Sequence, residues 1–376
     1  MEERTPSGTS CKKSARLLLC SKLLIIFFVL FLFNIYISPH RLLQSYHNVI
    51  TDYRSSALEN NHSIGRVFIA INLYQSQSLL QDGRWTCTLM EVIDQLGPNN
   101  VYLSIFENNS TDATPHLLRQ LEKQLKCEHR IVTTAINLDE DQYASLYIND
   151  RKGKYLSRMA YLAMVRNRAL EPIMSNGRFS KVLFLNDVVF SSQDVIQLLQ
   201  TNSGNYAAAC ALDFINPVKF YDTFATRDSL GYSMGLPLYP YFSPGRSQSQ
   251  VLRNSLIHVK SCWSGMAAFD SKPFENGLKF RSLDNVSDYD ASECCLIHAD
   301  INQPNRTFIN PRIHVAYSKF VYIWHKRLVY FESIWKPAQQ VITYLANLPR
   351  YNKYRTSKNG GFCWISGKKR LNYRSR

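Results

Sequence analysis

Between residues 66 and 212 the chain alternates short apolar runs with longer segments of helical periodicity. The clearest apolar runs are VFIAINL (67–73) and KVLFL (181–185), and runs of this length are typical of strands that are buried on both faces. Further strands are predicted at 101–106, 130–133 and 206–212. Helices are predicted at 79–96, 114–126 and 155–170, each with a proline or glycine near one end.

Strands that alternate with helices predict an α/β fold with a mostly parallel central sheet that is covered on both faces. The regular order weakens after Asp213, where Pro, Gly, Ser and Tyr are frequent. Ligands of such sheets bind at the carboxyl ends of the strands. Polar residues gather at these predicted ends, namely at Asn72, in the segment 107–112, at Asn186-Asp187 and at Asp213.

The N-terminal part has a different pattern, because residues 17–37 are almost continuously apolar. A helix of this length spans about 30 Å, which matches the hydrocarbon thickness of a bilayer. Lys12, Lys13 and Arg16 precede it, so the positive-inside rule keeps the N-terminus in the cytoplasm. A cleaved signal peptide is the alternative, but no Ala-x-Ala-like site follows. The pattern predicts an uncleaved signal-anchor and a single-pass type II membrane protein.

The composition excludes wholesale disorder, since 45% of the 376 residues are hydrophobic. The formal net charge of +15 suits nucleic acid, an anionic membrane surface or phosphorylated small molecules. Part of this charge lies in residues 351–376, which contain no acidic residue. No zinc-finger spacing or RNA-binding aromatic motif accompanies it, so we expect no nucleic-acid partner.

Nine cysteines are present, and seven of them lie beyond residue 37. None of them forms a C-x-x-C pair, which argues against a zinc site and against a thioredoxin-like centre. If disulfides form among the seven, at least one thiol stays free, and the pairing does not follow from the sequence.

Several side chains at the predicted strand ends have the chemistry to hold a nucleotide. Carboxylates and amides in the segment 107–112 can hydrogen-bond a base and a ribose, and the helix that follows favours phosphate at its N-terminus. Asp187 is placed to bind Mg²⁺ or Mn²⁺, which prefer oxygen ligands. Arg166 lies on the preceding helix and can neutralise a diphosphate. Ordinary caps and a solvated helix face are the alternatives.

Two later segments offer candidates for a sugar site and for catalysis. Trp263 can pack on a sugar ring, and Gly265 allows the backbone to approach closely; a core tryptophan is the alternative. Glu293 can orient an acceptor hydroxyl or take its proton, or it merely favours a helix N-terminus. Asp213, at the end of a predicted strand, is the second catalytic candidate.

Taken in order, these segments resemble the fungal cryptococcal mannosyltransferase and capsule-associated protein family of glycosyltransferases. The resemblance covers residues 66–320. It is carried by VFIAINLY (67–74), LGPNNVYLSIFENNSTDAT (96–114), YLAMVRNRALEP (161–172), KVLFLNDVVF (181–190), ALDF (211–214), FYDTFATRD (220–228), SCWSGMAAFD (261–270), FRSLDNVSDYDASECCLI (280–297) and PRIHVAYS (311–318).

The resemblance implies a GT-A-like Rossmann-type fold, a type II Golgi topology, and transfer of mannose from GDP-mannose in α-1,3 linkage, commonly with Mn²⁺. Asn186-Asp187 stand at the place of the metal-binding Asp-x-Asp, although Leu185 replaces its first Asp. GT-A enzymes often add a late His ligand, for which His298 and His314 are available. The resemblance places Glu107, Ser110 and Asp112 in the nucleotide-binding loop. Asn72, Asn108 and Arg166 are further nucleotide-binding candidates because of their places in the predicted elements.

We therefore predict a cytoplasmic tail (1–16), a transmembrane signal-anchor (17–37), a stem (38–65), a glycosyltransferase domain (66–330) and a basic C-terminal extension (331–376). The expected location is the Golgi membrane with a lumenal catalytic domain. The expected partners are a sugar nucleotide, the membrane through residues 17–37, and a mannoside or polysaccharide acceptor for capsule or cell-wall synthesis. The alternatives are a non-catalytic polysaccharide assembly or export factor, and the same fold with another sugar-nucleotide donor.

Overall fold

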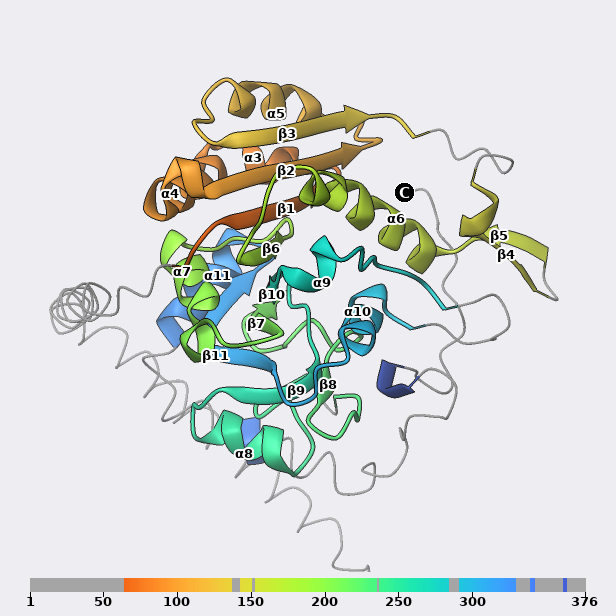
Figure 1. Ribbon diagram of the computed structural model, residues 1–376. Coiled ribbons are helices and arrows are strands. Elements are labelled where there is room, and N and C mark those ends of the chain that lie inside the picture. The colour runs from red at the N-terminus through yellow and green to blue at the C-terminus, as the bar shows by residue number, and fades with distance from the viewer. Residues whose placement is uncertain are drawn as a thin grey trace, which may run out of the picture. The chain divides into compact units, whose positions relative to one another are not determined.

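The computed structural model describes residues 64–136, 143–150, 153–234, 237–283, 291–328, 339–341 and 361–363. A nine-stranded sheet with the order β3-β2-β1-β6-β10-β7-β11-β9-β8 forms its centre (Figure 1). The strands are β1 (Val67–Leu73), β2 (Val101–Asn108), β3 (Glu128–Thr134), β6 (Lys181–Leu185), β7 (Ala208–Phe214), β8 (Arg227–Asp228), β9 (Ile257–Ser261), β10 (Met266–Asp270) and β11 (Thr307–Ala316).

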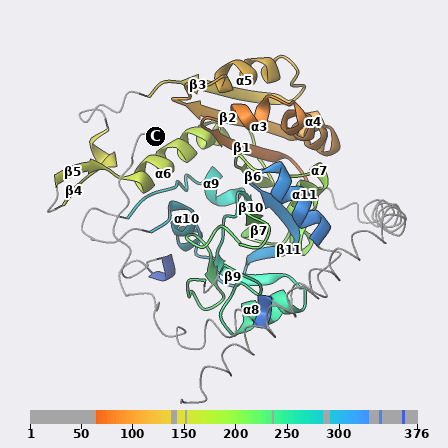
Figure 2. The same ribbon diagram turned by 180° about the vertical axis from the view of Figure 1, so that it is seen from behind.

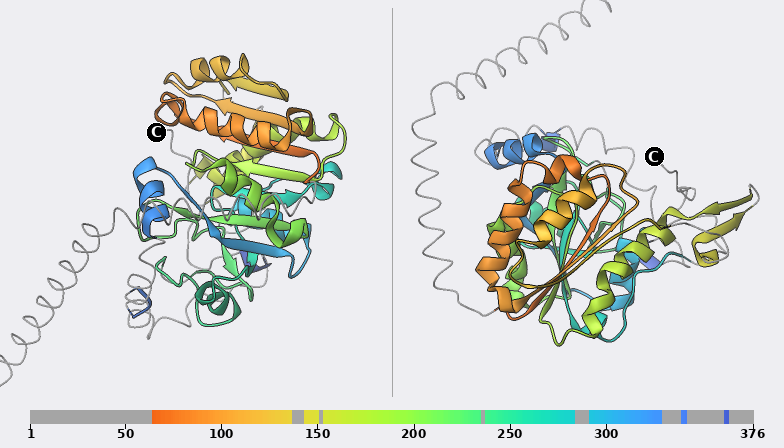
Figure 3. Two further views of the ribbon diagram at one scale, coloured as in Figure 1. Left: turned by 90° about the vertical axis from the view of Figure 1, so that its left-hand side faces the viewer. Right: turned by 90° about the horizontal axis from the view of Figure 1, so that it is seen from above.

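Helices cover both faces of this sheet, as the right-hand view of Figure 3 shows. One face carries α3 (Gln77–Leu80), α4 (Arg84–Leu96), α5 (Thr114–Glu122) and α7 (Ser192–Leu199), and the other carries α6 (Arg158–Leu170), α9 (Lys272–Glu275) and α10 (Glu293–Ile301). Helix α11 (Lys319–Leu328) lies beside α7 (Figure 2), where Tyr322 and Lys326 both contact Asp194. The remaining elements are α8 (Arg246–Leu252) and the hairpin of β4 (Tyr147–Asp150) and β5 (Gly153–Leu156).

The apolar runs form strands because both of their faces are buried. In β1, Val67, Ile69 and Ile71 join one hydrophobic core, which packs against α4, α5 and α7. Phe68 and Ala70 point to the opposite side and join a second core, which packs against α6, α9 and α10. A strand whose neighbours are apolar on both sides has no polar face to show to water, which explains its unbroken apolar sequence.

The expected α/β architecture is present, but the sheet is mixed rather than mostly parallel. Four neighbouring pairs are parallel, whereas the four that involve β10 with β6 and β7, and β9 with β11 and β8, are antiparallel. Strand β10 follows the turn Cys262–Gly265 without a crossover helix, so it enters the sheet from the opposite end. The prediction failed here because it assumed that a helix precedes every strand.

Individual elements agree more closely with the expectations. The strands predicted at 67–73 and 181–185 have the same bounds in β1 and β6. The helix predicted at 79–96 is divided into α3 and α4, because Gly83 has a φ of 71° and interrupts the helical backbone. The helix predicted at 155–170 begins later, at Arg158, where the side chain of Ser157 caps it.

The single-pass membrane location expected from the sequence is contradicted. Within the part of the chain that the structure describes, no helix has both the length and the apolar character to cross a bilayer. The segment 17–37, on which that expectation was based, lies outside the described residues.

Two disulfides connect parts of the fold that are distant in sequence. Cys210 of β7 is bonded to Cys262, and Cys295 of α10 is bonded to Cys363. Cys87, Cys127 and Cys294 are free. The expectation that at least one thiol stays free is therefore confirmed, and the pairing comes from the structure alone.

Candidate functional site

The carboxyl ends of the parallel strands lie in a row at one edge of the sheet. Glu107 of β2 pairs with Leu73 of β1, and Asp187 follows β6 by two residues. The turn Cys262–Gly265 enters this row because the backbone N–H of Asn186 donates to the carbonyl of Gly265 at 2.9 Å. Asp213 of β7 and Tyr317, directly after β11, complete it. Strands are about 4.8 Å apart, so Glu107 and Asp213 each lie about 10 Å from the end of β6.

The predicted nucleotide loop after β2 is braced by its own polar groups. Glu107 is buried, and its Oε1 accepts from the backbone N–H of Ser110 at 2.9 Å. The hydroxyl of Ser110 accepts from the backbone N–H of Gln75 at 2.9 Å. Asp112 accepts from the N–H groups of Gln77 and Thr114. These bonds join the loop to the β1–α3 connection. They are the contacts expected from the alternative to nucleotide binding, in which the residues act as ordinary caps.

The pKa of Asp112 is lowered. Burial of its carboxylate acts to raise that pKa, but the hydrogen bonds from Thr114 and Gln77 outweigh burial. Asn108 is buried and donates to the Tyr161 hydroxyl of α6. The loop is thus fixed in place before any ligand binds, which suits a binding site and an ordinary loop equally.

Asn72 has one unused polar atom at this edge. Its Nδ2 donates to the carbonyl of Val165 in α6 at 2.7 Å, which ties that helix to the end of β1. Its Oδ1 is buried and has no hydrogen-bond partner among the described residues. A buried acceptor without a partner costs free energy, so Asn72 has the capacity to accept a hydrogen bond from a ligand.

Arg166 is the centre of a buried group that connects α6, α10 and the turn Cys262–Gly265. Its Nε donates to Glu293 Oε1 at 3.0 Å, and both side chains are less than one-tenth exposed. The guanidinium carbon lies 4.3 Å from the centre of the Trp263 ring, a cation–π distance. Burial lowers the pKa of Arg166, but Cys294 and Glu293 raise it and prevail, so the group stays charged. Glu293 therefore holds Arg166 in position.

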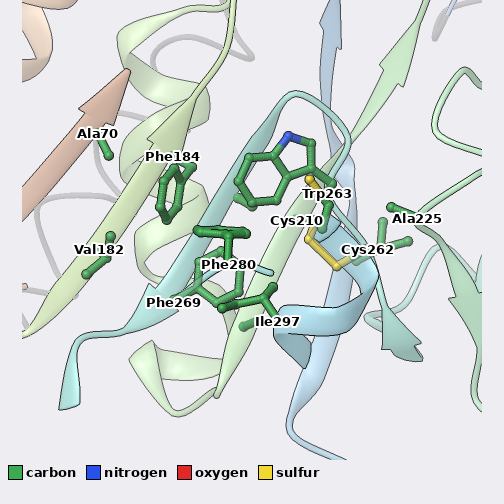
Figure 4. Close-up of a cluster of buried hydrophobic side chains, with 14 of the residues drawn as sticks. Ala70, Val182, Phe184, Cys210, Ala225, Cys262, Trp263, Phe269, Phe280 and Ile297 are labelled. Atoms are coloured by element: carbon green, nitrogen blue, oxygen red, sulfur yellow. A yellow bond between two sulfur atoms is a disulfide. The ribbon is translucent and has the colours of Figure 1, made fainter. Parts of the chain in front are cut away.

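Trp263 belongs to the hydrophobic core rather than to an open surface (Figure 4). Its ring lies 5.1 Å from that of Phe184 and 5.7 Å from that of Phe280, centre to centre. The disulfide partner Cys262 precedes it directly and fixes its backbone to β7. The alternative considered for Trp263, a core tryptophan, is the arrangement that the structure has. It therefore offers its face to Arg166 and not to a sugar.

Among the carboxylates named at these strand ends, Asp187 is accessible to solvent, whereas Glu107 and Asp213 are buried. Its side chain is exposed, while Leu185 and Val188 on either side are buried. The protein that crowds around it raises its pKa by desolvation, and the positive charge of Arg166 acts in the opposite direction. A carboxylate that is accessible and poorly compensated is suited to a cation. One carboxylate fits Mg²⁺ or Mn²⁺ in the mode in which most remaining ligands are water and substrate phosphates.

Asp213, Asp222 and Tyr317 form a second polar group next to Asp187. Asp213 is fully buried; one oxygen accepts from the backbone N–H of Asp222 at 3.0 Å and the other from the hydroxyl of Tyr317 at 3.2 Å. Burial, and then the charge of Asp222, raise the pKa of Asp213 well above its ordinary value. Burial also raises the pKa of Asp222. Asp213 thus accepts hydrogen bonds from within the protein.

Asp222 holds the turn that contains Ser264 and Gly265. Its Oδ2 accepts from the backbone N–H groups of Trp263 at 2.9 Å and Ser264 at 3.1 Å. Ser264 has a φ of 54°, which is uncommon for a residue with a side chain. Gly265 has a φ of 66°, and a Cβ there would lie 2.6 Å from Val188 Cγ1 and 3.3 Å from the Tyr317 hydroxyl. Glycine is required by both conformation and space.

The two histidines considered as late metal ligands both contact other protein groups. His298 is buried and bonds to the carbonyl of Cys262 at 2.7 Å; burial lowers its pKa to about 4. Among the described residues, Cys210, Cys262 and His298 are close enough to share a metal ion, but the two sulfurs are joined as a disulfide and provide no thiolate. His314 lies in β11, with its ring 5.5 Å from that of Phe214.

The residues predicted for the site did not include Tyr317, Asp222 or Tyr221. Tyr317 follows β11, a strand that was not predicted, although its run TFIN followed by IHVA is apolar and β-branched. Asp222 and Tyr221 lie in the segment FYDTFATRD, which was noted only as part of a resemblance. Recognising β11 would have placed Tyr317 at the same edge as Asp187.

With this geometry in place, comparisons with known proteins identify relatives. The α-1,3-mannosyltransferase CMT1 of Cryptococcus neoformans var. neoformans is 25% identical over 284 residues, which are 68% of this chain and 59% of that protein. The chain therefore spans less than two thirds of the length of this relative.

Two solved structures match this chain at low sequence identity. The mannosyltransferase PcManGT of Pyrobaculum calidifontis, in complex with GDP-Man and Mn²⁺, is 14% identical, with a TM-score of 0.40 over 76% of this chain and 64% of its own. TarS of S. aureus, in complex with UDP, is 11% identical, with a TM-score of 0.37 over 75% of this chain and 71% of its own.

A family model described as "Cryptococcal mannosyltransferase 1" matches residues 66–300, more than half of the chain. This range includes β1, β2, β6 and β7, with Asp187 and Asp213 at the site edge. The chain therefore belongs to the cryptococcal mannosyltransferase 1 family of glycosyltransferases.

Proposed function

We propose that this protein transfers mannose from GDP-mannose to a mannoside acceptor, forming an α-1,3 linkage in capsule or cell-wall glycan synthesis. Family membership and the activity in the name of its relative support the reaction class. The main structural support for the proposed site is Asp187. This residue is exposed, it lies near the middle of the row of strand ends, and the pKa of its carboxyl group is raised.

The donor would lie across the strand ends, with its diphosphate at Asp187. Asn72 has a buried acceptor oxygen that is free to bind a donor hydroxyl or amide. The fixed backbone of the segment Glu107–Asp112 provides a rigid wall on one side. Arg166 is held by Glu293 and directs positive charge toward Asp187, which favours the diphosphate as it leaves.

Mn²⁺ or Mg²⁺, held by Asp187, would supply charge neutralisation to the departing diphosphate. In the transfer, the bond between mannose and phosphate breaks, a bond between mannose and the acceptor oxygen forms, and the acceptor hydroxyl passes its proton to an oxygen of the departing diphosphate. An α-linked product retains the configuration of the α-linked donor, so a separate general base is not required. The buried positions of Glu293 and Asp213 are compatible with that route, and their catalytic assignment stays a prediction.

The test uses the purified full chain with GDP-mannose, MnCl₂ and a mannobiose, and measures mannotriose by mass spectrometry. We expect Asp187→Asn to reduce the rate by about 100-fold or more, because it removes the anionic oxygen ligand. Glu128→Gln is the matched control. Glu128 is an exposed carboxylate paired with Arg66 at the amino end of β3, on the opposite edge of the sheet.

The outcomes distinguish the proposed enzyme from the alternative functions. Transfer that is lost in Asp187→Asn and kept in Glu128→Gln supports the proposal. Transfer from another sugar nucleotide, but not from GDP-mannose, corrects the donor and keeps the enzyme. A protein that neither transfers any sugar nor binds any sugar nucleotide in calorimetric titrations with Mn²⁺ would be a non-catalytic assembly or export factor.

A further inference from the structure

Tyr221 is an aromatic residue at the site edge that no step of the proposed reaction uses. It lies in the segment that follows β7, one residue before Asp222, and the residue is 49% exposed. A single exposed aromatic residue is common on protein surfaces and needs no explanation by itself. Its surroundings distinguish Tyr221, because the residue is held in place on two sides.

The first constraint is on the backbone of Tyr221. Its N–H donates to the carbonyl of Asp213 at 2.9 Å, and its own carbonyl accepts from the N–H of Thr223 at 2.7 Å. The second constraint is on the ring, which packs edge to face with that of Tyr317 at 4.8 Å between centres. A ring that is already ordered loses little conformational entropy when a ligand packs on it.

Tyr317 connects this exposed ring to the row of strand ends that includes Asp213 and Asp187. Its hydroxyl donates to Asp213 Oδ2 at 3.2 Å and lies 3.3 Å from the position of a Cβ on Gly265. Gly265 in turn accepts from the backbone N–H of Asn186, which precedes Asp187. Tyr221 is therefore one aromatic ring away from the turn that lies beside Asp187. An exposed ring next to oxygen-rich side chains matches a pyranose, which presents C–H groups on its faces and hydroxyls at its rim.

We propose that Tyr221, supported by Tyr317, forms the binding platform for the neutral glycoside acceptor, and that the ring positions the acceptor hydroxyl toward the sugar of the donor whose diphosphate lies at Asp187. This inference rests on the proposed function, since it assigns the acceptor side of the same site. Tyr221 is a binding residue in this account and takes no part in bond making. Its hydroxyl is not required, because only the face of the ring packs on the sugar.

The experiment compares three variants of the full chain with the wild-type protein. Tyr221→Ala removes the ring, Tyr221→Phe keeps the ring and removes the hydroxyl, and Leu230→Ala is the matched control. Leu230 is a more exposed apolar residue (72%) that lies two residues after β8. We expect Tyr221→Ala to raise the KM for mannobiose by about tenfold while the affinity for GDP with Mn²⁺ is unchanged. Tyr221→Phe and Leu230→Ala should both behave like the wild-type protein.

A second measurement makes the inference independent of turnover. Saturation-transfer NMR with mannobiose, in the absence of any nucleotide, detects acceptor binding directly. Binding that is present in the wild type and lost in Tyr221→Ala supports the platform even if no transfer is observed, in which case the proposed function alone has failed. Mannobiose binding that is absent in the wild type, or unchanged in Tyr221→Ala, overturns the inference, as does a loss of GDP affinity equal to the loss of acceptor affinity.

Discussion

Asp213 is an acidic side chain with no exposed surface, and it keeps this position because two donors are directed at it. The backbone N–H of Asp222 and the hydroxyl of Tyr317 each donate to a different oxygen. These bonds do not offset the loss of hydration, since burial and the nearby Asp222 hold the pKa of Asp213 well above its usual range. The residue therefore retains a proton in the folded protein at pH values where the unfolded chain has released it.

This proton gives a pH dependence of stability with a defined sign. Because the folded-state pKa is raised, the contribution of Asp213 to the free energy of unfolding is largest below its ordinary pKa of about 3.9. That contribution declines as the pH rises from there toward the folded-state pKa. Asp213→Asn removes the titration and keeps an oxygen for the Asp222 N–H. We expect the variant to match the wild type near pH 4 and to exceed its stability at pH 7.

Urea unfolding at several pH values between 4 and 8 gives the two free energies of unfolding. The difference between variant and wild type should grow as the pH increases. A difference that stays constant, or that shrinks toward neutral pH, would mean that Asp213 is ionised in the folded protein.

At the scale of elements, the turn between β9 and β10 fixes where β10 enters the sheet, between β6 and β7. Asp222 accepts from the N–H groups of Trp263 and Ser264, and Gly265 accepts from Asn186. The turn is thus fixed from both sides, with Ser264 and Gly265 in left-handed conformations. Its position next to Val188 and Tyr317 leaves no space for an additional carbon atom.

Gly265→Ala should consequently destabilise the protein by about 1–3 kcal/mol, because the new methyl group would lie 2.6 Å from Val188 Cγ1. Val188→Ala alone should cost about 1–3 kcal/mol, since Val188 is fully buried. Combining the two relieves the contact. In a double-mutant cycle measured by urea unfolding, we expect the double variant to lose less stability than the sum of the single variants. Strict additivity would show that Val188 does not limit the turn.

The same elements show how far the sequence predicts this fold. Strands β1 and β6 were predicted with their bounds, because a strand that is buried on both faces has a nearly continuous run of apolar residues. Strand β10 was not placed, because its direction depends on a turn held by Asp222, and Asp222 lies more than forty residues earlier in the chain. A contact of that separation leaves no local pattern.

In the candidate site, too, residues marked by a local sequence pattern were predicted and contacts between distant segments were not. Asp187, Glu107, Asn72 and Asp213 were found because strand ends can be read from the apolar runs. The engagement of Trp263 and Glu293 with Arg166 was not predicted, as it requires α6, α10 and the turn to meet in space. The residues predicted at the strand ends therefore lie at one edge of the sheet, where Asp187 is exposed and Glu107 and Asp213 are buried.

At the scale of the whole molecule, a short segment near the C-terminus completes the fold. Residues Gly361–Cys363 pack against α10, and Cys363 is bonded to Cys295. The guanidinium of Arg227, which is fully buried, donates to the carbonyls of Phe362 and Cys363 as well as to those of Phe224 and Thr226. Burial lowers the pKa of Arg227 to about 10. The predicted domain boundary at residue 330 stays a prediction, but these contacts assign residues 361–363 to the core of the domain.

Cys363→Ser should therefore destabilise the protein by about 2–4 kcal/mol, because the bond closes a loop of 68 residues and because Arg227 depends on the same segment for two acceptors. Cys87→Ser is the control, since Cys87 is exposed and free. Thermal unfolding without reductant should give a lower Tm for Cys363→Ser and an unchanged one for Cys87→Ser. Equal Tm values for the two variants would show that residues 361–363 do not support the fold.

The bond between Cys295 and Cys363 also sets an order of events during biosynthesis. When Cys295 leaves the ribosome, its partner is still 68 residues away, which corresponds to roughly 3–14 s of translation. During this interval Cys295 stands next to Cys294, a second thiol that ends up buried and unpaired. Two adjacent thiols competing for one late partner create an opportunity for mispairing. The yield of correctly paired protein should then depend on how fast the last part of the chain is made.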